Sequence, residues 1–362
     1  MKRGIVEHDE YDQHDGEFID DETDDRARRE RKRRGPLFVL FMLCLLILLI
    51  PALILGFYLG RGYFAVDSIE RDASLTPTEY EGRPAPAVPK SEDPDAPVPV
   101  NFVLMGSDSR GSDRGRSDSL MVAHVTGDRQ HVYLISFPRD MWVEVPGRGN
   151  AKINAAYSWG GPALTVRTLE NLLGVRMDHT VAIDFEGFIN LTNAVGGVTV
   201  HNPWATPEHP EGEIQIQGED ALTYVRERYL LPNGDLDRAY RQRSVVKAII
   251  RKLATPETLT NPARFSDVAG QVADTLTVDD QMTNSYVTQL GTSMRIFGAD
   301  GVRMMQAPIS GFATIQGQSV DVVDQGRLDM LATSLQTDDM DFYFRSYGQD
   351  NYAQLPQVDP PE

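Results

Sequence analysis

The chain has 362 residues, of which 41% are hydrophobic and 24% are charged, and its formal net charge is −18. This length is enough for about two domains or for one large one, and the composition excludes a chain that is disordered throughout. The excess of acidic residues argues against nucleic acid as a partner, because proteins that bind it present a net basic face. The single cysteine, Cys44, lies within an apolar run, which excludes a disulfide framework and a zinc site built from cysteines.

Residues 1–60 predict a membrane anchor. Residues 1–35 are first acidic and then basic, which is typical of a disordered tail. Residues 36–60 carry no charge, and at about 1.5 Å per residue a helix of that length crosses a hydrocarbon core of ~30 Å. Because the basic run RARRERKRR precedes the apolar segment, the positive-inside rule places the tail in the cytoplasm. We therefore expect a single-pass protein of the cell membrane with a large extracytoplasmic part.

The extracytoplasmic part divides into three segments by composition. Residues 61–99 contain seven prolines and predict a semi-rigid, extended linker. Residues 100–336 hold alternating apolar patterns, and we expect them to form one folded domain. Residues 337–362 are acidic and contain prolines, and we expect most of them to be a poorly ordered C-terminal tail.

Strand patterns alternate with helical patterns within the predicted domain. Apolar runs predict strands at 100–106, 119–125, 131–137 and 180–185 and near 302–307. Helical spacing predicts helices at 163–173, 188–195 and 238–253 and near 263–275 and 283–297, with a stop at Gly196-Gly197. This order indicates an α/β fold, with α+β as the alternative, in which helices cover a mixed central sheet.

Two aspartates lie at the ends of neighbouring predicted strands. The first strand leads into a loop that contains Asp108 and Arg110, and Arg116 and Asp118 open the next strand. Two carboxylates so placed are suited to share a hard cation such as Mg²⁺, although a polar hairpin with surface acids has the same spacing. Arg139 follows the third strand, and we expect it at the same edge of the sheet.

Arginines are concentrated between residues 226 and 243. Asp235, Arg238 and Gln242 have the spacing of one helix face, with Asp235 near the helix start. The planar guanidinium group favours bidentate capture of phosphate oxygens, so the cluster predicts a phosphate site. A solvated basic helix face is the alternative interpretation. The cluster consists of Arg226, Arg228, Arg238, Arg241 and Arg243.

Six motifs occur between about residues 101 and 243, while the common nucleotide-binding, serine-hydrolase and zincin motifs are missing from the sequence. The motifs are NFVLMGSDSRG, RSDSLMVAHV, SFPRD, KINAAYSWGG, AIDFEGFINLTNAVGGVTV and YVRERYLLPNGDLDRAYRQR. In their order and content the sequence resembles the LytR-CpsA-Psr (LCP) family, membrane-anchored enzymes of the bacterial envelope. The resemblance covers most of residues 100–336, which it identifies as the LCP catalytic domain.

The resemblance implies a phosphotransferase that moves a glycopolymer from a polyprenyl-pyrophosphate carrier to peptidoglycan, outside the membrane and with Mg²⁺ or Mn²⁺. By position, Asp108 and Asp118 correspond to the acids that hold the metal, and Asp235 to a residue that orients an arginine or helps to deprotonate the acceptor. The pyrophosphate-binding residues would be Arg139, which also counts as catalytic, and Arg226, Arg228, Arg238 and Gln242, with Arg110 and Arg116 as weaker candidates.

The resemblance also implies a hydrophobic tunnel for the lipid, built from segments such as 163–173, 183–195 and 245–253. Two other functions use the same residues: a pyrophosphatase that acts on polyprenyl-pyrophosphate sugars, and a non-catalytic protein that binds lipid pyrophosphate or regulates the envelope. The sequence leaves open which glycopolymer is transferred. It also leaves open whether Asp118, Asp235 or the phosphate itself is the base.

Overall fold

The structure is a computed structural model, and it describes residues 67–88, 96–107, 117–253, 255, 270, 272–296, 299–348, 352 and 355–361. The predicted cytoplasmic tail and the predicted span at 36–60 lie outside these ranges. Within them, no helix is both long enough and apolar enough to cross a membrane.

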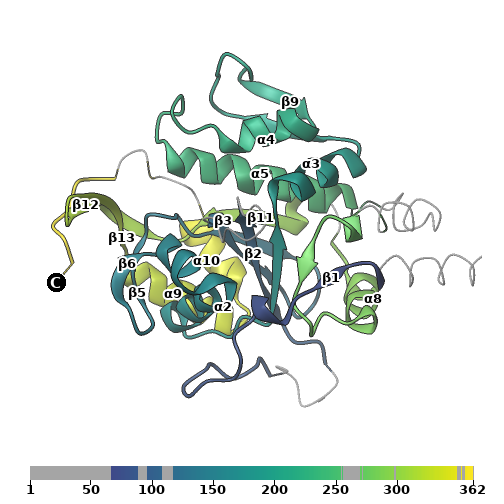
Figure 1. Ribbon diagram of the computed structural model, residues 1–362, viewed down its shortest axis with the longest axis horizontal. Coiled ribbons are helices and arrows are strands. Elements are labelled where there is room, and N and C mark those ends of the chain that lie inside the picture. The colour runs from purple at the N-terminus through teal and green to yellow at the C-terminus, as the bar shows by residue number, and fades with distance from the viewer. Residues whose placement is uncertain are drawn as a thin grey trace, which may run out of the picture. The chain divides into compact units, whose positions relative to one another are not determined.

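A seven-stranded mixed sheet forms the centre of the fold (Figure 1). Its strands are β1 Glu70–Arg71, β2 Val100–Ser107, β3 Ser117–Val125, β4 Val132–Ser136, β7 His179–Ile183, β10 Thr277–Val278 and β11 Val302–Gln306. Their order across the sheet is β1-β10-β7-β2-β3-β4-β11. Strands β2, β3 and β4 are antiparallel neighbours, while β7 and β11 run parallel to β2 and β4.

Strand β2 is apolar on both sides. Val103 and Met105 point into one hydrophobic cluster, and Phe102 and Leu104 point into another. Successive side chains of a strand face opposite sides of the sheet, so a strand of this kind requires cover on both faces. Helices supply that cover.

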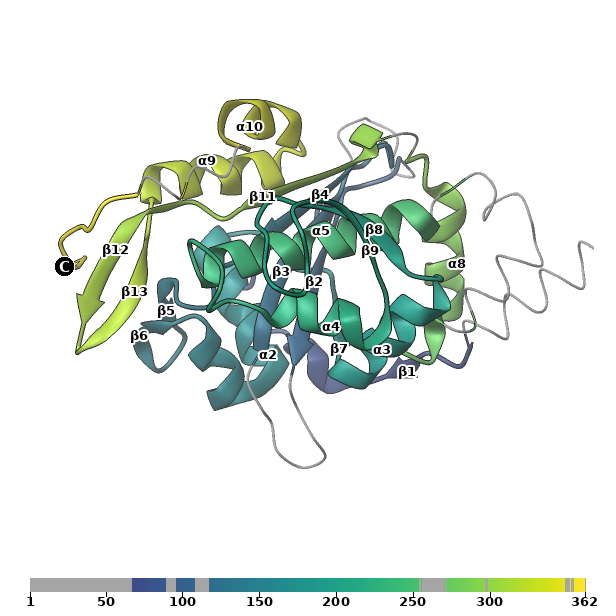
Figure 2. The same ribbon diagram turned by 90° about the horizontal axis from the view of Figure 1, so that it is seen from above.

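Two groups of helices sandwich the sheet (Figures 1 and 2). Helices α2, α9 and α10 contribute to the cluster around Val103, and α5 and α8 contribute to the cluster around Phe102. Helices α3 and α4 pack with α5 and the β8–β9 hairpin in a further cluster. The helices are α2 Asn154–Leu173, α3 Phe185–Ala194, α4 Gly218–Arg226, α5 Asp235–Leu253, α8 Asn284–Ser293, α9 Gln325–Gln336 and α10 Met340–Tyr347, with hairpins β5–β6 (Trp142–Val145, Gly149–Lys152), β8–β9 (Val198–Asn202, Gly212–Ile216) and β12–β13 (Ile309–Ile315, Gln318–Val323).

The predicted α/β architecture is confirmed, with differences at element ends. The helix expected at 163–173 begins nine residues earlier, at Asn154, because the chain continues through a kink at Gly161 (φ 69°, ψ −161°) instead of starting there. The stop after α3 is as predicted, since Gly196 and Gly197 adopt φ values of 71° and 72° that favour glycine. Most of the helix expected near 263–275 lies outside the described residues.

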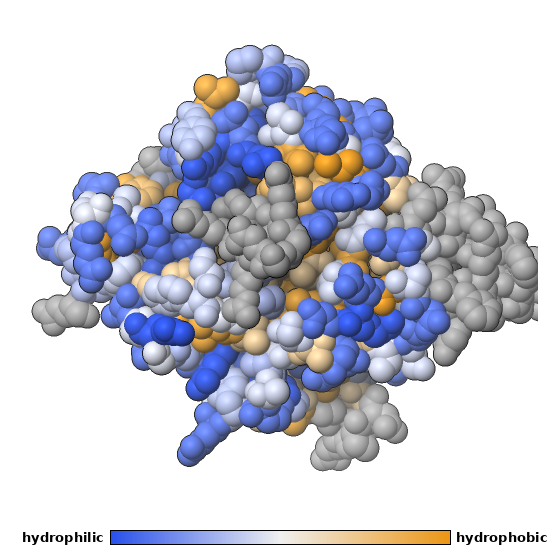
Figure 3. All heavy atoms as spheres, in the orientation of Figure 1, coloured by the Kyte–Doolittle hydropathy of each residue, from blue (hydrophilic) through white to orange (hydrophobic). Residues whose placement is uncertain are grey.

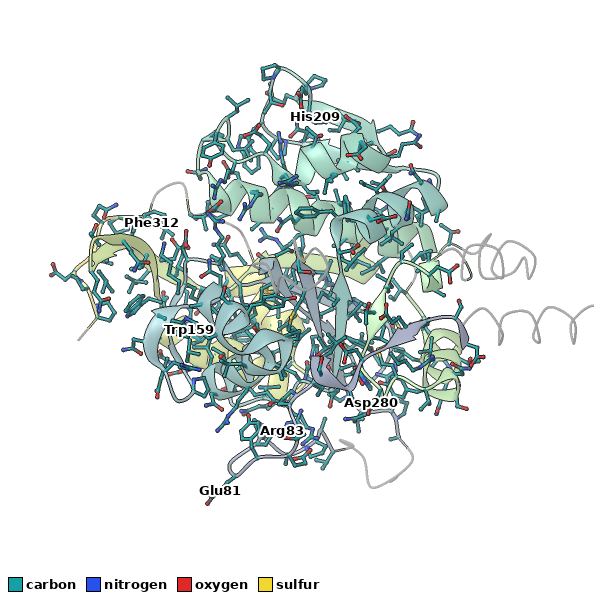
Figure 4. All side chains as sticks on the ribbon, viewed as in Figure 1. Glu81, Arg83, Trp159, His209, Asp280 and Phe312 are labelled. Atoms are coloured by element: carbon teal, nitrogen blue, oxygen red, sulfur yellow. The ribbon has the colours of Figure 1, made fainter. Side chains whose placement is uncertain are left out.

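The predicted linker at 61–99 is not an extended spacer where the structure describes it. Strand β1 joins the edge of the sheet by pairing with β10. Arg83 Nη2 lies 3.0 Å from Glu170 Oε1 of α2, with side chains only 3% and 0% exposed, and Tyr80 donates to the same carboxylate over 2.9 Å. Figure 4 shows Arg83 beside α2. A buried ion pair therefore fixes this proline-rich segment on the domain.

The expectation of a poorly ordered tail at 337–362 is also wrong in part. Met340 and Tyr343 of α10 are 1% and 2% exposed and belong to the main core, and Val358 N donates to Phe312 O of β12 over 2.8 Å. The acidic residues around them dominate the composition, but Met340, Tyr343, Phe344 and Tyr347 still follow helical spacing. The folded domain thus extends beyond residue 336.

Candidate functional site

A cavity of about 650 Å³ lies between the central sheet and helices α3, α4 and α5. We call it the arginine cavity because its lining combines a long apolar part with four arginines. In Figure 3, hydrophobic side chains reach the surface near α3 beside strongly hydrophilic ones. The apolar part is contributed by both the sheet and the helices and includes Phe102, Leu104, Met121, Val181, Phe188, Leu222, Val246 and Ile249.

The polar part of the lining contains five of the residues predicted from the sequence. They come from three places: the segment after β4, the end of α4 with the connection that follows it, and the first half of α5. The five are Arg139, Arg226, Arg228, Arg238 and Gln242.

Asp235, at the first position of α5, holds three of these arginines together. Its Oδ2 lies 2.7 Å from Nε and Nη2 of Arg139. Its Oδ1 lies 3.3 Å from Arg238 Nη2 and 3.6 Å from Arg228 Nη1. A carboxylate between three guanidinium groups limits their mutual repulsion and fixes their orientation. This arrangement favours an orienting role for Asp235.

Arg226 is placed differently. It ends α4, is exposed, and its guanidinium carbon lies 4.5 Å from the centre of the Phe185 ring. Within the described part of the chain it has no carboxylate partner. Gln242 Nε2 donates to Val225 O over 3.4 Å, which ties α5 to the end of α4. Arg226 is thus a cation with capacity for an anionic ligand.

The other two arginines of the cluster serve the fold. Arg241 is fully buried, donates to Asn202 Oδ1 over 3.0 Å and to Trp204 O over 2.9 Å, and lies over the Tyr224 ring. Burial lowers the pKa of its guanidinium group. Arg243, also fully buried, donates to Ser136 of β4. The spacing of the five arginines in the sequence did not show that Arg241 and Arg243 are buried in the fold, whereas the other three line the cavity.

The predicted metal site is not described by the structure. Asp108, Arg110 and Arg116 lie outside the described residues, as does the side chain of Asp118. The strand ends that flank them are described: Gly106 pairs with Ser119, and both line the arginine cavity. Among the residues described, no three His, Cys, Asp or Glu side chains are grouped as metal ligands.

Sequence reasoning missed an ionic network behind Arg139. Lys152 Nζ lies 2.8 Å from Asp140 Oδ1, and Asp140 Oδ2 lies 3.9 Å from Arg139 Nε. Asp321 of β13 donates its backbone N–H to Asp140 O over 2.9 Å. Burial, together with the charges of Asp140 and Asp235, raises the pKa of Asp321 to about 7. Asp140 and Lys152 had a signal in the sequence, as parts of the SFPRD and KINAAYSWGG motifs, whereas Asp321 lies in none of the six motifs.

Comparison with known proteins supports the resemblance of the motifs. The sequence profile of the LytR_cpsA_psr family matches residues 63–337. Polyisoprenyl-teichoic acid–peptidoglycan teichoic acid transferase TagU of Bacillus anthracis is 37% identical over 189 residues, which are 51% of this chain and 62% of that relative. TagU of Bacillus licheniformis is 35% identical over 243 residues, which are 64% of this chain and 78% of that protein. The aligned part thus spans less than two thirds of the Bacillus anthracis relative.

Solved structures share the fold. The crystal structure of B. subtilis TagV superposes with a TM-score of 0.58 at 27% identity and covers 67% of this chain and 98% of that chain. The structure titled "TagT bound to LI-WTA" superposes with a TM-score of 0.54 at 24% identity, over 69% of this chain and 93% of that one. Because the family profile extends over most of the described domain, the chain belongs to the LytR_cpsA_psr family.

Proposed function

We propose that the protein is a phosphotransferase that moves a glycopolymer from a polyprenyl-pyrophosphate carrier to peptidoglycan. One observation carries the proposal: a single, mainly apolar cavity of about 650 Å³ has four arginines in its lining. A polyprenyl pyrophosphate is a ligand with both properties, an apolar chain and a multiply charged head. The names of the TagU relatives, which refer to polyisoprenyl-linked teichoic acid and peptidoglycan, support the same reaction class.

The two parts of the ligand would bind by different interactions. Burial of the prenyl chain contributes about 0.8 kcal/mol for each CH₂ group removed from water. Arg226, Arg228 and Arg238 would bind the pyrophosphate oxygens by charge-assisted hydrogen bonds, and Asp235 would hold their orientation. The apolar chain thus confers affinity, and the arginines fix the position of the phosphorus atoms.

The transfer breaks one bond and forms another. A hydroxyl oxygen of peptidoglycan attacks the phosphorus attached to the saccharide, and the bond from that phosphorus to the bridging oxygen breaks. Polyprenyl phosphate leaves with the bonding electron pair, and the hydroxyl proton passes to a base. Arg139 and the other cavity arginines neutralise the charge that develops on the phosphoryl oxygens.

A divalent cation remains part of the proposal. Gly106 and Ser119 bring the ends of β2 and β3 to the arginine cavity, which fits a metal held by the neighbouring Asp108 and Asp118. When bound there, Mg²⁺ would supply further neutralisation of the pyrophosphate charge. We also propose that residues 36–60 anchor the protein in the cell membrane, with the catalytic domain and its lipid substrate outside the cytoplasm.

The proposal is tested with the full chain in detergent, a polyprenyl-pyrophosphate saccharide and a peptidoglycan acceptor. We would measure polyprenyl phosphate release and saccharide attachment, with and without Mg²⁺, for the wild type and Arg226→Ala. Arg345→Ala, whose side chain is 76% exposed on α10, is the matched control. Coupled release and attachment, reduced by Arg226→Ala and not by the control, supports transfer. Release without attachment indicates a pyrophosphatase, and binding without release indicates a non-catalytic protein; either result overturns the proposal.

A further inference from the structure

A second cavity, of about 690 Å³, adjoins the arginine cavity. The two share Ile183, Asp184 and Leu276 in their walls. At the end of β2, Gly106 lines the arginine cavity and the next residue, Ser107, lines the second one. Two ligands, one bound in each cavity, would therefore meet at the ends of β2 and β7. We call the second cavity the polar cleft.

The polar cleft has the opposite charge to its neighbour. Carboxylate, amide and hydroxyl groups from β1, α2, α3 and the segment before β10 line it, and none of its described lining residues is Lys, Arg or His. Carboxylates accept hydrogen bonds from hydroxyl and amide groups and repel phosphates. The side chains used in this argument are Glu70, Asp72, Tyr157, Glu186, Asn190 and Asp274.

Tyr157 of α2 points to a polar ligand. Its side chain lines the polar cleft although the residue is only 7% exposed. Its hydroxyl has no hydrogen-bond partner among the described residues. A largely buried hydroxyl without a protein partner is expected to bond to water or to a ligand.

Two further groups are free to bind. Glu186 and Asn190 lie one turn apart on α3, are exposed, and have no side-chain hydrogen bond or ion pair within the described ranges. Asp184, in contrast, is engaged, because its Oδ1 caps α3 by accepting from Gly187 N over 2.7 Å. Tyr157 on one wall and the Glu186–Asn190 pair on another supply donors and acceptors from two elements.

We propose that the polar cleft binds the acceptor, and that it recognises the uncharged glycan of peptidoglycan through its hydroxyl and acetamide groups. This inference rests on the proposed transfer function. A saccharide held by Tyr157, Glu186 and Asn190 presents a hydroxyl across the Ile183–Asp184 wall to the phosphorus bound by the arginines. The opposite charges of the two cavities also sort the substrates, because the acidic cleft excludes the anionic head of the donor.

The first test measures acceptor binding without the donor. We would record saturation-transfer difference NMR of a peptidoglycan tetrasaccharide whose lactyl carboxyl groups are capped as amides, with the full chain in detergent, and compare Tyr157→Phe and Glu186→Ala/Asn190→Ala with the wild type. The matched control is Glu219→Ala, an exposed acid on α4 outside the described lining of both cavities. We expect binding to the wild type and to the control, weakening of about fivefold in Tyr157→Phe and about tenfold or more in the double variant.

The second test uses the transfer reaction. We expect the KM for the tetrasaccharide to rise about fivefold in Tyr157→Phe and about tenfold or more in Glu186→Ala/Asn190→Ala. The Kd for the polyprenyl-pyrophosphate donor should stay unchanged in both variants. Equal loss of donor affinity, an unchanged acceptor KM, or binding only of free stem peptides through their amines would each overturn the inference. If the tetrasaccharide binds as expected but no acceptor is modified, the proposed transfer fails while the glycan site stands.

Discussion

Three arginines of the site depend on one carboxylate. Arg139, Arg228 and Arg238 surround Asp235, which is absent from the described lining of the cavity itself. Motif spacing was sufficient to predict that Asp235 and Arg238 share a helix face. It was not sufficient to show that Arg241 and Arg243 are buried, because their partners, Asn202 and Ser136, are remote in sequence.

The substitution Asp235→Asn tests the orienting role. The amide keeps the size of the carboxylate but loses its charge, so the arginines stay cationic while their positions are released. We expect turnover to fall by roughly 10- to 100-fold and the donor Kd to change less than about threefold. Single-turnover kinetics measures the change in turnover, and donor titration measures the change in the donor Kd. A loss of donor affinity as large as the loss of turnover would contradict an orienting role.

Asp321 predicts a pH dependence of stability. Burial and the neighbouring Asp140 and Asp235 raise its pKa to about 7, against an ordinary value of 3.8. Between these values the folded chain holds a proton that the unfolded chain has lost, so this carboxyl lowers stability as pH rises towards 7. Asp321→Asn removes that contribution, and we expect it to stabilise the protein at pH 8 by on the order of 2–4 kcal/mol relative to wild type.

Urea unfolding at pH 5 and pH 8 measures the Asp321 effect. Asp280→Asn, at an exposed acid, is the control and should leave the pH dependence as it is in the wild type. If the unfolding free energy changes equally between pH 5 and pH 8 in the wild type and in Asp321→Asn, then Asp321 does not carry this proton.

At the scale of elements, the sequence predicted strands well and connections poorly. Strands β2, β3 and β4 are long apolar runs, so their pattern and their turns identified them. Segment 67–88 is rich in proline and charge, and its attachment depends on one buried contact between Arg83 and Glu170. Composition cannot reveal such a contact, because it joins residues 87 positions apart.

The Arg83–Glu170 pair is expected to hold segment 67–88 on α2. Arg83→Ala leaves a buried carboxylate with fewer partners, and we expect the free energy of unfolding to fall by about 3 kcal/mol. Arg345→Ala, which breaks an exposed pair with Asp341, should cost less than about 1 kcal/mol. Urea unfolding of both variants checks the difference, and equal costs would contradict the role of burial.

At the scale of the whole molecule, the helices cover the two faces of the sheet differently. Helices α2, α9 and α10 fill one face with a continuous apolar cluster, whereas α3, α4 and α5 leave the arginine cavity open over the other. The apolar segments 183–195 and 245–253 do contribute to the cavity wall, but 163–173 belongs to the core. Periodicity alone did not distinguish these two uses of an apolar face.

The substitution Val246→Trp tests whether the apolar part holds a lipid chain. Val246 of α5 lines the cavity, and a larger side chain there would occupy space needed by a long prenyl chain. We expect the Kd for a long-chain donor to rise about tenfold or more, and that for a short-chain donor to change less than about threefold. Equal effects on both donors would contradict a lipid cavity, provided that the thermal unfolding midpoint is retained.

The central claim is that a phosphoryl group passes from the lipid carrier to a peptidoglycan hydroxyl. The most direct measurement is the reaction of the full chain in ¹⁸O-labelled water, with mass spectrometry of the saccharide product. Transfer predicts a phosphodiester on peptidoglycan without ¹⁸O, formed in equal amount with polyprenyl phosphate and reduced in Arg226→Ala. A free saccharide phosphate carrying ¹⁸O, with no product on peptidoglycan, would contradict the account and show that water is the acceptor.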